Sequence, residues 1–86
     1  MFEFDPKKSK ANKEKHKIDF VEAQELWSVP SIILNSLYAE EGRMLLIAEL
    51  RNKCWTAIFT NRFDNVRIIS VRRSRKKEEE LFYEKE

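Results

Sequence analysis

Large hydrophobic residues are sparse at the start of the chain and then gather in four short runs. The runs cover about residues 31–37, 43–50, 53–60 and 65–71, and each is rich in Ile, Leu, Val or aromatic residues. Short polar breaks separate them, the first of which contains the only glycine, Gly42. Four strands joined by such short links predict an antiparallel meander.

A helix is predicted over residues 6–16, because Asp5 and Pro6 are typical of the N-cap and the first helical position. This segment is rich in Lys and has few large apolar residues. We therefore expect it to pack through Phe4, Ala11 and His16 only.

Two further helices complete the predicted elements. Asp19 and Glu22 have the spacing of a capping box, so a second helix is expected to follow and to end at Val29 and Pro30. Residues 74–86 predict a C-terminal helix with Ser74 as its N-cap. The chain is thus expected to be a single α+β domain over residues 1–86, with two N-terminal helices and a C-terminal helix packed on a small antiparallel meander sheet of about four strands.

Composition fits a small folded domain. Of the 86 residues, 42% are hydrophobic and 37% charged, which allows a core but not an extensive one. No apolar run approaches the roughly 18 residues that span a bilayer, so we expect a cytoplasmic protein without a membrane partner. The single cysteine, Cys54, lies in an apolar strand beside Trp55 and is interpreted as a packing residue.

Positive charge is concentrated at two places, although the formal net charge is only +2. Residues 67–77 hold six basic residues and no acidic residue, and residues 1–17 hold six Lys against three acids. If the fold brings these segments together, they form one electropositive surface. Arg matches the geometry of a phosphate group, so the expected substrate is a polyanion, most readily RNA.

The residue types exclude several kinds of chemistry. With one Gly, one Cys and one His, the chain has no phosphate-binding Gly-rich loop and no CxxC, HExxH or EF-hand motif, so no metal site and no cofactor are expected. RNA can still be cleaved without a metal, because its 2′-hydroxyl can attack the adjacent phosphodiester. The reaction needs a proton acceptor, a proton donor and cations that stabilise the developing negative charge. His16 is the residue suited to proton transfer near neutral pH, unless it only caps or packs its helix.

Arg67, Arg72 and His16 are the candidate catalytic residues. Strand alternation places Arg67 and Arg72 on opposite faces, but a bulge or a bend after Ser70 would let Arg72 or Arg73 join Arg67. The other candidate RNA-binding residues are Lys13, Lys15, Arg62, Arg73, Arg75, Lys76 and Lys77. For Lys76 and Lys77, an ordinary solvated surface is the favoured interpretation.

Residues near both ends of the chain resemble one family, the BrnT toxins of bacterial type II toxin–antitoxin modules. The similarity lies in Phe2-Glu3-Phe4-Asp5, Lys8, Asn12, Lys15-His16, Ile18, Phe20 and Ala23, and then in residues 67–73 and Glu78. The chain departs from that pattern at Lys17, where most relatives have Gly, near Ala48, and at Ser74-Arg75.

The resemblance implies a RelE-like ribonuclease fold, in which helices pack on a small antiparallel sheet. It also implies metal-independent RNA cleavage that halts translation, and neutralisation by a BrnA-like antitoxin, a ribbon-helix-helix DNA binder. By the resemblance, Lys15, His16, Arg67 and Arg72 belong to the active surface, with the general acid and base left open. A homodimer and a heterotetramer are both compatible with the sequence.

Two other functions remain compatible with the same residues. A non-catalytic RNA- or DNA-binding module would use the same cations without an acid/base pair. A protein-interaction domain would use the basic surface to bind an acidic partner.

Overall fold

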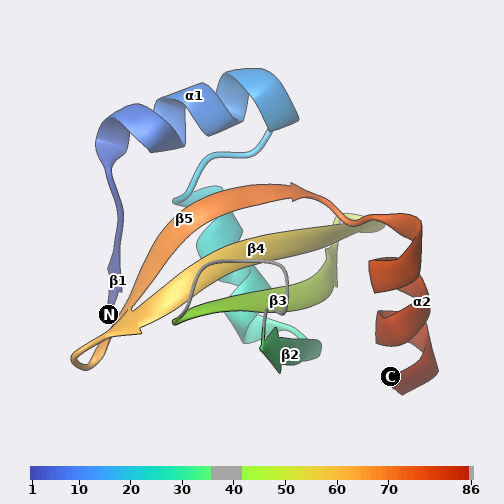
Figure 1. The fold of residues 1–86 in the computed structure, drawn as a ribbon. Helices are drawn as coiled ribbons and strands as arrows, with labels where there is room; N and C mark the ends of the chain where they lie inside the picture. Colours follow the sequence, from blue (N-terminus) through green and yellow to red (C-terminus); the bar gives the residue numbers. More distant parts are fainter. Residues whose placement is uncertain (36–41, 86) are drawn as a thin grey trace.

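The computed structural model describes residues 1–35 and 42–85, and its centre is a mixed five-stranded sheet (Figure 1). The strands follow the order β1-β5-β4-β3-β2 across the sheet; their bounds are β1 (Phe2–Glu3), β2 (Ser31–Asn35), β3 (Arg43–Leu50), β4 (Lys53–Arg62) and β5 (Asn65–Arg73). β1 runs parallel to β5, and the other neighbouring pairs are antiparallel. The helical segments are α1 (Pro6–His16), the 3-10 helix η1 (Glu22–Ser28) and α2 (Lys76–Lys85).

The predicted four-stranded antiparallel meander with two N-terminal helices is wrong. The chain begins with a strand, which adds a parallel pair to the sheet, and the second predicted helix is a 3-10 helix. A two-residue strand is too short to show alternation in the sequence. It forms because the Val66 N–H donates to Met1 O at 2.9 Å and because the Phe2 ring packs edge-on against Trp27 at 5.1 Å.

The local signals at Asp5 and at Asp19 are confirmed, whereas the prediction of Ser74 as an N-cap is wrong, since α2 begins at Lys76 and the Ser74 hydroxyl is hydrogen-bonded to Thr56. The Lys7 N–H donates to Asp5 Oδ1 at 2.9 Å, with Pro6 in the first turn of α1. Asp19 and Glu22 exchange reciprocal side-chain to backbone hydrogen bonds of 2.7 and 3.0 Å. The predicted strand end at residues 36 and 37, the turn residues 40 and 41, and residue 86 lie outside the described residues.

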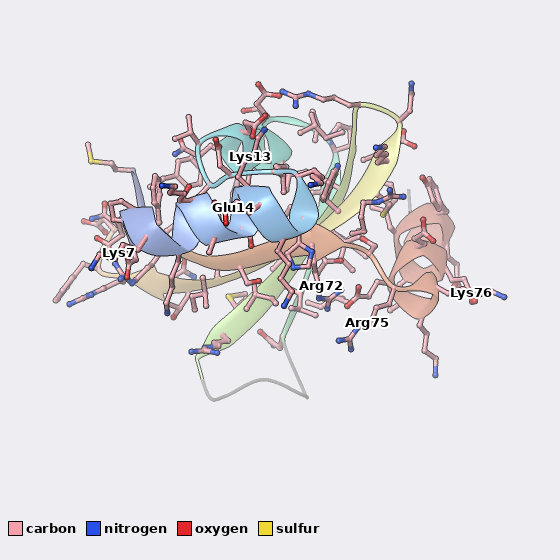
Figure 2. All side chains as sticks on the ribbon, turned by 90° about the horizontal axis from the view of Figure 1, so that it is seen from above. Lys7, Lys13, Glu14, Arg72, Arg75 and Lys76 are labelled. Atoms are coloured by element: carbon pink, nitrogen blue, oxygen red, sulfur yellow. The ribbon has the colours of Figure 1, made fainter. Side chains whose placement is uncertain are left out.

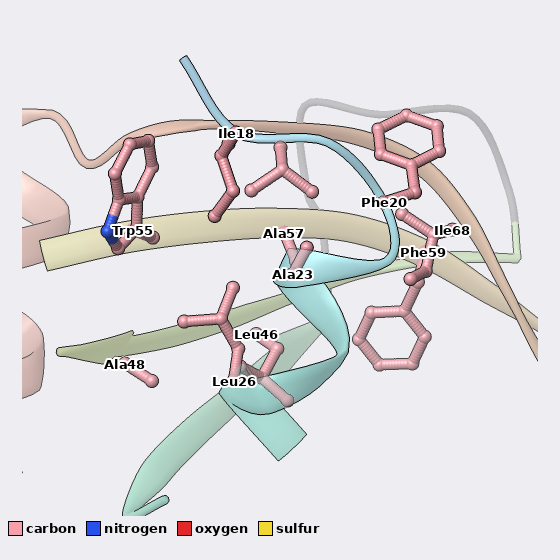
Figure 3. Packing of buried hydrophobic residues seen from close by; sticks show 11 residues of the cluster. Ile18, Phe20, Ala23, Leu26, Leu46, Ala48, Trp55, Ala57, Phe59 and Ile68 are labelled. Atoms are coloured by element: carbon pink, nitrogen blue, oxygen red, sulfur yellow. The ribbon is translucent and has the colours of Figure 1, made fainter. Parts of the chain in front are cut away.

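Hydrophobic side chains pack on both faces of the sheet. On the face covered by η1 and the segment before it, the core consists of Ile18, Phe20, Ala23, Leu26, Leu46, Ala48, Trp55, Ala57, Phe59, Ile68 and Val71 (Figure 3). On the other face, Phe82 of α2 covers Ile47 and Cys54. Cys54 is buried, as expected, and burial raises the pKa of its thiol. Among the described residues, no helix is long and apolar enough to cross a membrane.

Phe4 packs against the core at the start of α1, as expected, with its ring 5.7 Å from that of Phe20, but within the helix polar side chains and not Ala11 attach it to the sheet. Its buried residues are Ser9 and Asn12, whereas Ala11 is exposed. The Asn12 Oδ1 accepts the Val71 N–H at 3.2 Å, and its Nδ2 donates to Val71 O at 2.9 Å and to Ile18 O at 2.7 Å.

The position of this asparagine explains why it is buried. β1 pairs only with Val66 and Arg67, so the rest of the β5 edge lacks a strand partner. Unpaired strand edges expose donors and acceptors that a neighbouring group has to satisfy. The Asn12 amide satisfies both groups of Val71. A side chain of α1 therefore continues the sheet edge where β1 ends.

α1 ends at a residue that has to adopt a left-handed conformation. Lys17 has φ 68° and ψ 21°, and its N–H donates to Lys13 O. Glycine is favoured at such a position because it lacks Cβ.

We predict that Asn12→Ala lowers the free energy of unfolding by about 2–4 kcal/mol, because it leaves buried backbone groups of Val71 and Ile18 without a partner. Lys10→Ala, at an exposed position of the same helix, should change it by less than about 0.5 kcal/mol. Chemical denaturation measures both. Equal stabilities for the two variants would contradict the role given to Asn12.

Lys17→Gly should raise the free energy of unfolding by roughly 0.5–1 kcal/mol, because it relieves the left-handed conformation at the helix end. Lys10→Gly should lower it by about 1 kcal/mol, since Lys10 lies in the helix interior. Thermal unfolding of the two variants should therefore shift in opposite directions, and a shift in the same direction would be evidence against the observed helix end.

Candidate active site

An open groove of about 240 Å³ lies between α1 and β5. The residues that line it are Lys8, Ala11, Asn12, Lys15, His16, Ile69 and Ser70. The only histidine of the chain therefore shares a concave surface with two lysines. At this groove, part of the basic N-terminal segment lies against the last strand. A single electropositive surface required these two segments to lie together.

His16 is the last residue of α1 and is partly buried. Burial lowers the pKa of its imidazole below 6.5, and the positive charges of Lys15 and Arg72 lower it further. These effects disfavour the imidazolium form, so His16 is mainly neutral at pH 7 and can accept a proton. His16, Lys15 and Arg72 thus share one electrostatic environment.

Arg72 is held in place by a partly buried carboxylate. Its Nη1 and Nη2 donate to the two carboxylate oxygens of Glu78 at 2.8 and 2.9 Å, and the two side chains are 19% and 13% exposed. The Thr56 hydroxyl and the Arg75 N–H also donate to Glu78 Oε1, at 3.0 and 2.8 Å. A bidentate pair with further hydrogen bonds fixes the guanidinium in one orientation.

The charge of Glu78 is retained in spite of its burial. Burial by itself raises the pKa of this carboxyl group, but the hydrogen bonds from Arg72, Arg75 and Thr56 outweigh burial and hold the pKa at about 2. Glu78 is consequently ionised at neutral and mildly acidic pH. Arg72 keeps its partner over the whole range in which His16 titrates.

A β-bulge in β5 sets the direction of its arginines. The successive β4 residues Ile58 and Phe59 pair with Ser70 and Ile68 of β5. Ile69 lies between these two β5 residues and is therefore the extra residue of the bulge. The bulge shifts the alternation of side chains by one position. It precedes Ser70, whereas the sequence analysis considered a bend after it.

The shift places Arg67 and Arg72 on the same face of the sheet. Their partners in β4 are Thr60 and Thr56, which are four residues apart in a regular strand and so point to one side. Arg73 pairs with Trp55 on the opposite face, where its guanidinium lies 5.6 Å from the indole ring centre. Of the two adjacent arginines, Arg72 is therefore the one that joins Arg67.

Arg67 lies farther from the groove than the sequence analysis assumed. The spacing of its β4 partner puts it roughly 13 Å along the sheet from Arg72. Its Nη1 is 3.6 Å from Glu3 Oε1, and Arg62 Nη1 is 3.8 Å from the same oxygen. Arg62 and Arg67 form a second cationic cluster near the start of β5, separate from His16 and Arg72.

Lys13 does not face the groove. It forms an ion pair of 2.6 Å with Glu22, and this hydrogen bond is the main reason that the pKa of Glu22 falls to about 2. Figure 2 shows Lys13 on the opposite side of α1 from Arg72. Its charge stabilises the contact between α1 and η1.

The basic residues at the start of α2 are exposed. Arg75, Lys76 and Lys77 do not line the groove. In Figure 2, Arg75 lies on the same side as Arg72, whereas Lys76 extends away from the sheet.

Glu78 is the residue that the analysis of charge missed, since residues 67–77 were considered without an acidic neighbour. It is the third residue of α2, and its carboxylate accepts the N–H of the residue before the helix, as the glutamate of a capping box does. That signal was hidden because the residue before the helix is Arg75 and not Ser, Thr, Asp or Asn. Within the described residues, no three His, Cys, Asp or Glu side chains cluster as metal ligands would.

A family model described as the ribonuclease toxin BrnT of type II toxin–antitoxin systems matches residues 4–78. The matched range includes α1, the whole of β5 and Glu78. No curated protein gives a significant match to the chain.

The His16 environment predicts a measurable titration. By NMR, the imidazole should titrate with a pKa below 6.5 in the wild-type protein and closer to or above 6.5 in Arg72→Gln, because that change removes a positive charge and leaves Glu78 unpaired. Lys10→Gln should leave the pKa of His16 unchanged. An identical titration in Arg72→Gln and the wild type would show that the end of α1 does not lie beside Arg72.

Proposed function

Since the chain belongs to the BrnT family of ribonuclease toxins of type II toxin–antitoxin systems, we propose that the groove between α1 and β5 is where it cleaves RNA. The observation that carries this proposal is that His16 and Lys15 line the groove, while Arg72, oriented by Glu78, lies close enough to lower the pKa of His16. The family gives the class of reaction, and these three side chains supply a way to perform it.

The proposed reaction is metal-independent transesterification. His16 accepts the proton of a ribose 2′-hydroxyl, whose oxygen then forms a bond to the adjacent phosphorus while the bond from phosphorus to the 5′-oxygen breaks. The departing 5′-oxygen takes a proton from a second donor, for which Lys15 is the candidate in the groove. The products are a 2′,3′-cyclic phosphate and a free 5′-hydroxyl.

Arg72 is proposed to stabilise the negative charge that develops on the phosphoryl oxygens. Its orientation is fixed before substrate binds, so little reorganisation is needed in the transition state. The bidentate contact with Glu78 occupies Nη1 and Nη2. Glu78 is thus a positioning residue for Arg72. Arg67 and Arg62, farther along the sheet, are proposed to bind flanking RNA.

The expected consequence in a cell is inhibition of translation through loss of intact RNA. A type II toxin has a protein antitoxin as its partner. We propose that a BrnA-like ribbon-helix-helix antitoxin covers the groove with acidic and apolar groups, since complementary charge would both direct binding and exclude RNA.

Incubation of the purified protein with single-stranded RNA in excess EDTA tests the reaction. We expect cleavage to persist and mass spectrometry to find 2′,3′-cyclic phosphate ends. His16→Ala should lower the rate by about 10²–10⁴-fold, which is typical for loss of a general base. Arg72→Ala should also lower it strongly, and Lys10→Ala should not.

Products with a 3′-hydroxyl and a 5′-phosphate, or a rate unchanged in His16→Ala, would contradict the mechanism. Binding of RNA without cleavage by the wild type would favour a non-catalytic RNA-binding module instead.

A further inference from the structure

The turn between β4 and β5 places an aromatic ring in solvent. Phe63, the first residue of this turn, is 96% exposed and has φ 57°. A bulky side chain at positive φ is a backbone outlier, and a fully exposed ring gains nothing from burial. The next residues, Asp64 and Asn65, are types that tolerate this conformation better.

Phe63 has no evident role in folding. Among the described residues, neither hydrophobic cluster and none of the aromatic pairs includes it. Backbone outliers that persist without a packing role often occur at functional positions. The ring is therefore available to a ligand.

The charges around Phe63 indicate how such a ligand would be held. Arg62 is 61% exposed and Arg67 36% exposed, and both lie near Glu3 Oε1 at distances longer than a hydrogen bond. The negative charges of Glu3 and Asp64 offset the positive charges of Arg62 and Arg67. General attraction of phosphate is consequently weak at this end of the sheet, and the ring has to supply much of any binding.

The turn lies far from the groove. Figure 1 shows it at the opposite end of β5 from α2, near the N-terminus. From Phe63 to Thr56, the β4 partner of Arg72, the strand covers about 23 Å. A ligand that reaches both places has to be an extended chain.

We propose that Phe63 stacks on an unpaired base of single-stranded RNA, several nucleotides from the phosphate in the groove, while Arg62 and Arg67 contact the backbone nearby. This inference rests on the proposed function, because it takes the groove as the cleavage site. Stacking on aromatic rings and pairing with arginine are the usual means by which proteins hold single-stranded RNA. The ring thus selects substrates long enough to reach the turn.

Binding is measured with a 20-nucleotide single-stranded RNA that carries 2′-O-methyl groups and cannot be cleaved. Phe63→Ala should weaken binding roughly tenfold, the effect typical of losing one stacked base, and Phe63→Trp should retain it. The loss in Phe63→Ala should be similar at low and high salt, whereas the loss in Arg62→Ala should shrink as salt screens its charge.

Phe63→Asn distinguishes a loss of RNA binding from a loss of folding stability. It should raise the melting temperature by relieving the backbone, yet it should lose RNA binding to the same extent as Phe63→Ala. Cleavage of a trinucleotide, which is too short to reach the turn, should be equal in the wild type and in both variants.

Wild-type affinity for the 20-nucleotide RNA in both Phe63→Ala and Phe63→Asn would overturn the proposal. Unchanged RNA affinity with lost binding of the antitoxin would also overturn it, and would assign the turn to a protein interface. If the wild type binds RNA through Phe63 and cleaves no RNA, the stacking role stands and the cleavage mechanism fails.

Discussion

The hydrogen bonds between the Asn12 amide and Val71 are the contact on which the site depends. α1 has almost no apolar surface, so the hydrophobic effect gives little reason for it to lie against the sheet. The edge of β5 provides that reason, because its backbone groups need a partner beyond the end of β1. The need of the β5 edge for hydrogen-bond partners thereby places His16 beside the end of β5, because His16 lies one helical turn after Asn12.

Arg72 and Glu78 supply the fixed charge at that place. A buried ion pair often adds little to stability, since desolvation offsets the attraction of the charges. It does fix orientation, and Thr56 and Arg75 strengthen this effect by donating to the same carboxylate. Glu78 partly neutralises the positive charge of Arg72, but it fixes the position of the guanidinium group. Lys8 and Lys15 leave the groove itself cationic.

Short-range signals in the sequence identified many of the elements and few of their contacts. Asp5 with Pro6, and Asp19 with Glu22, marked helix starts because capping depends on residues only two or three positions apart. The pairing of β1 with β5 joins residues more than sixty positions apart, and no local pattern encodes it. The predicted sheet failed for that reason.

The sequence also predicted some residues of the candidate site and not others. The charge pattern selected His16, Lys15 and Arg72, which the fold brings together, but it also selected Lys13, which pairs with Glu22. The bulge at Ile69 decides that Arg72 and not Arg73 shares a face with Arg67. Its trace in the sequence is the adjacent pair Ile68-Ile69, which interrupts the apolar–polar alternation but does not by itself identify a bulge. Glu78 follows the basic cluster directly, and its contact with Arg72 was not predicted, because its position comes from tertiary packing against Thr56.

Amide hydrogen exchange at Val71 tests the attachment of α1 most directly. This N–H donates to Asn12 Oδ1 at 3.2 Å, on the edge of β5 beyond its pairing with β1. If α1 is bound along the edge of β5, the Val71 amide should exchange as slowly as the amides between β4 and β5. Exchange at the rate of an unprotected surface amide would show that α1 is not held there, and His16 and Arg72 would then have no common site.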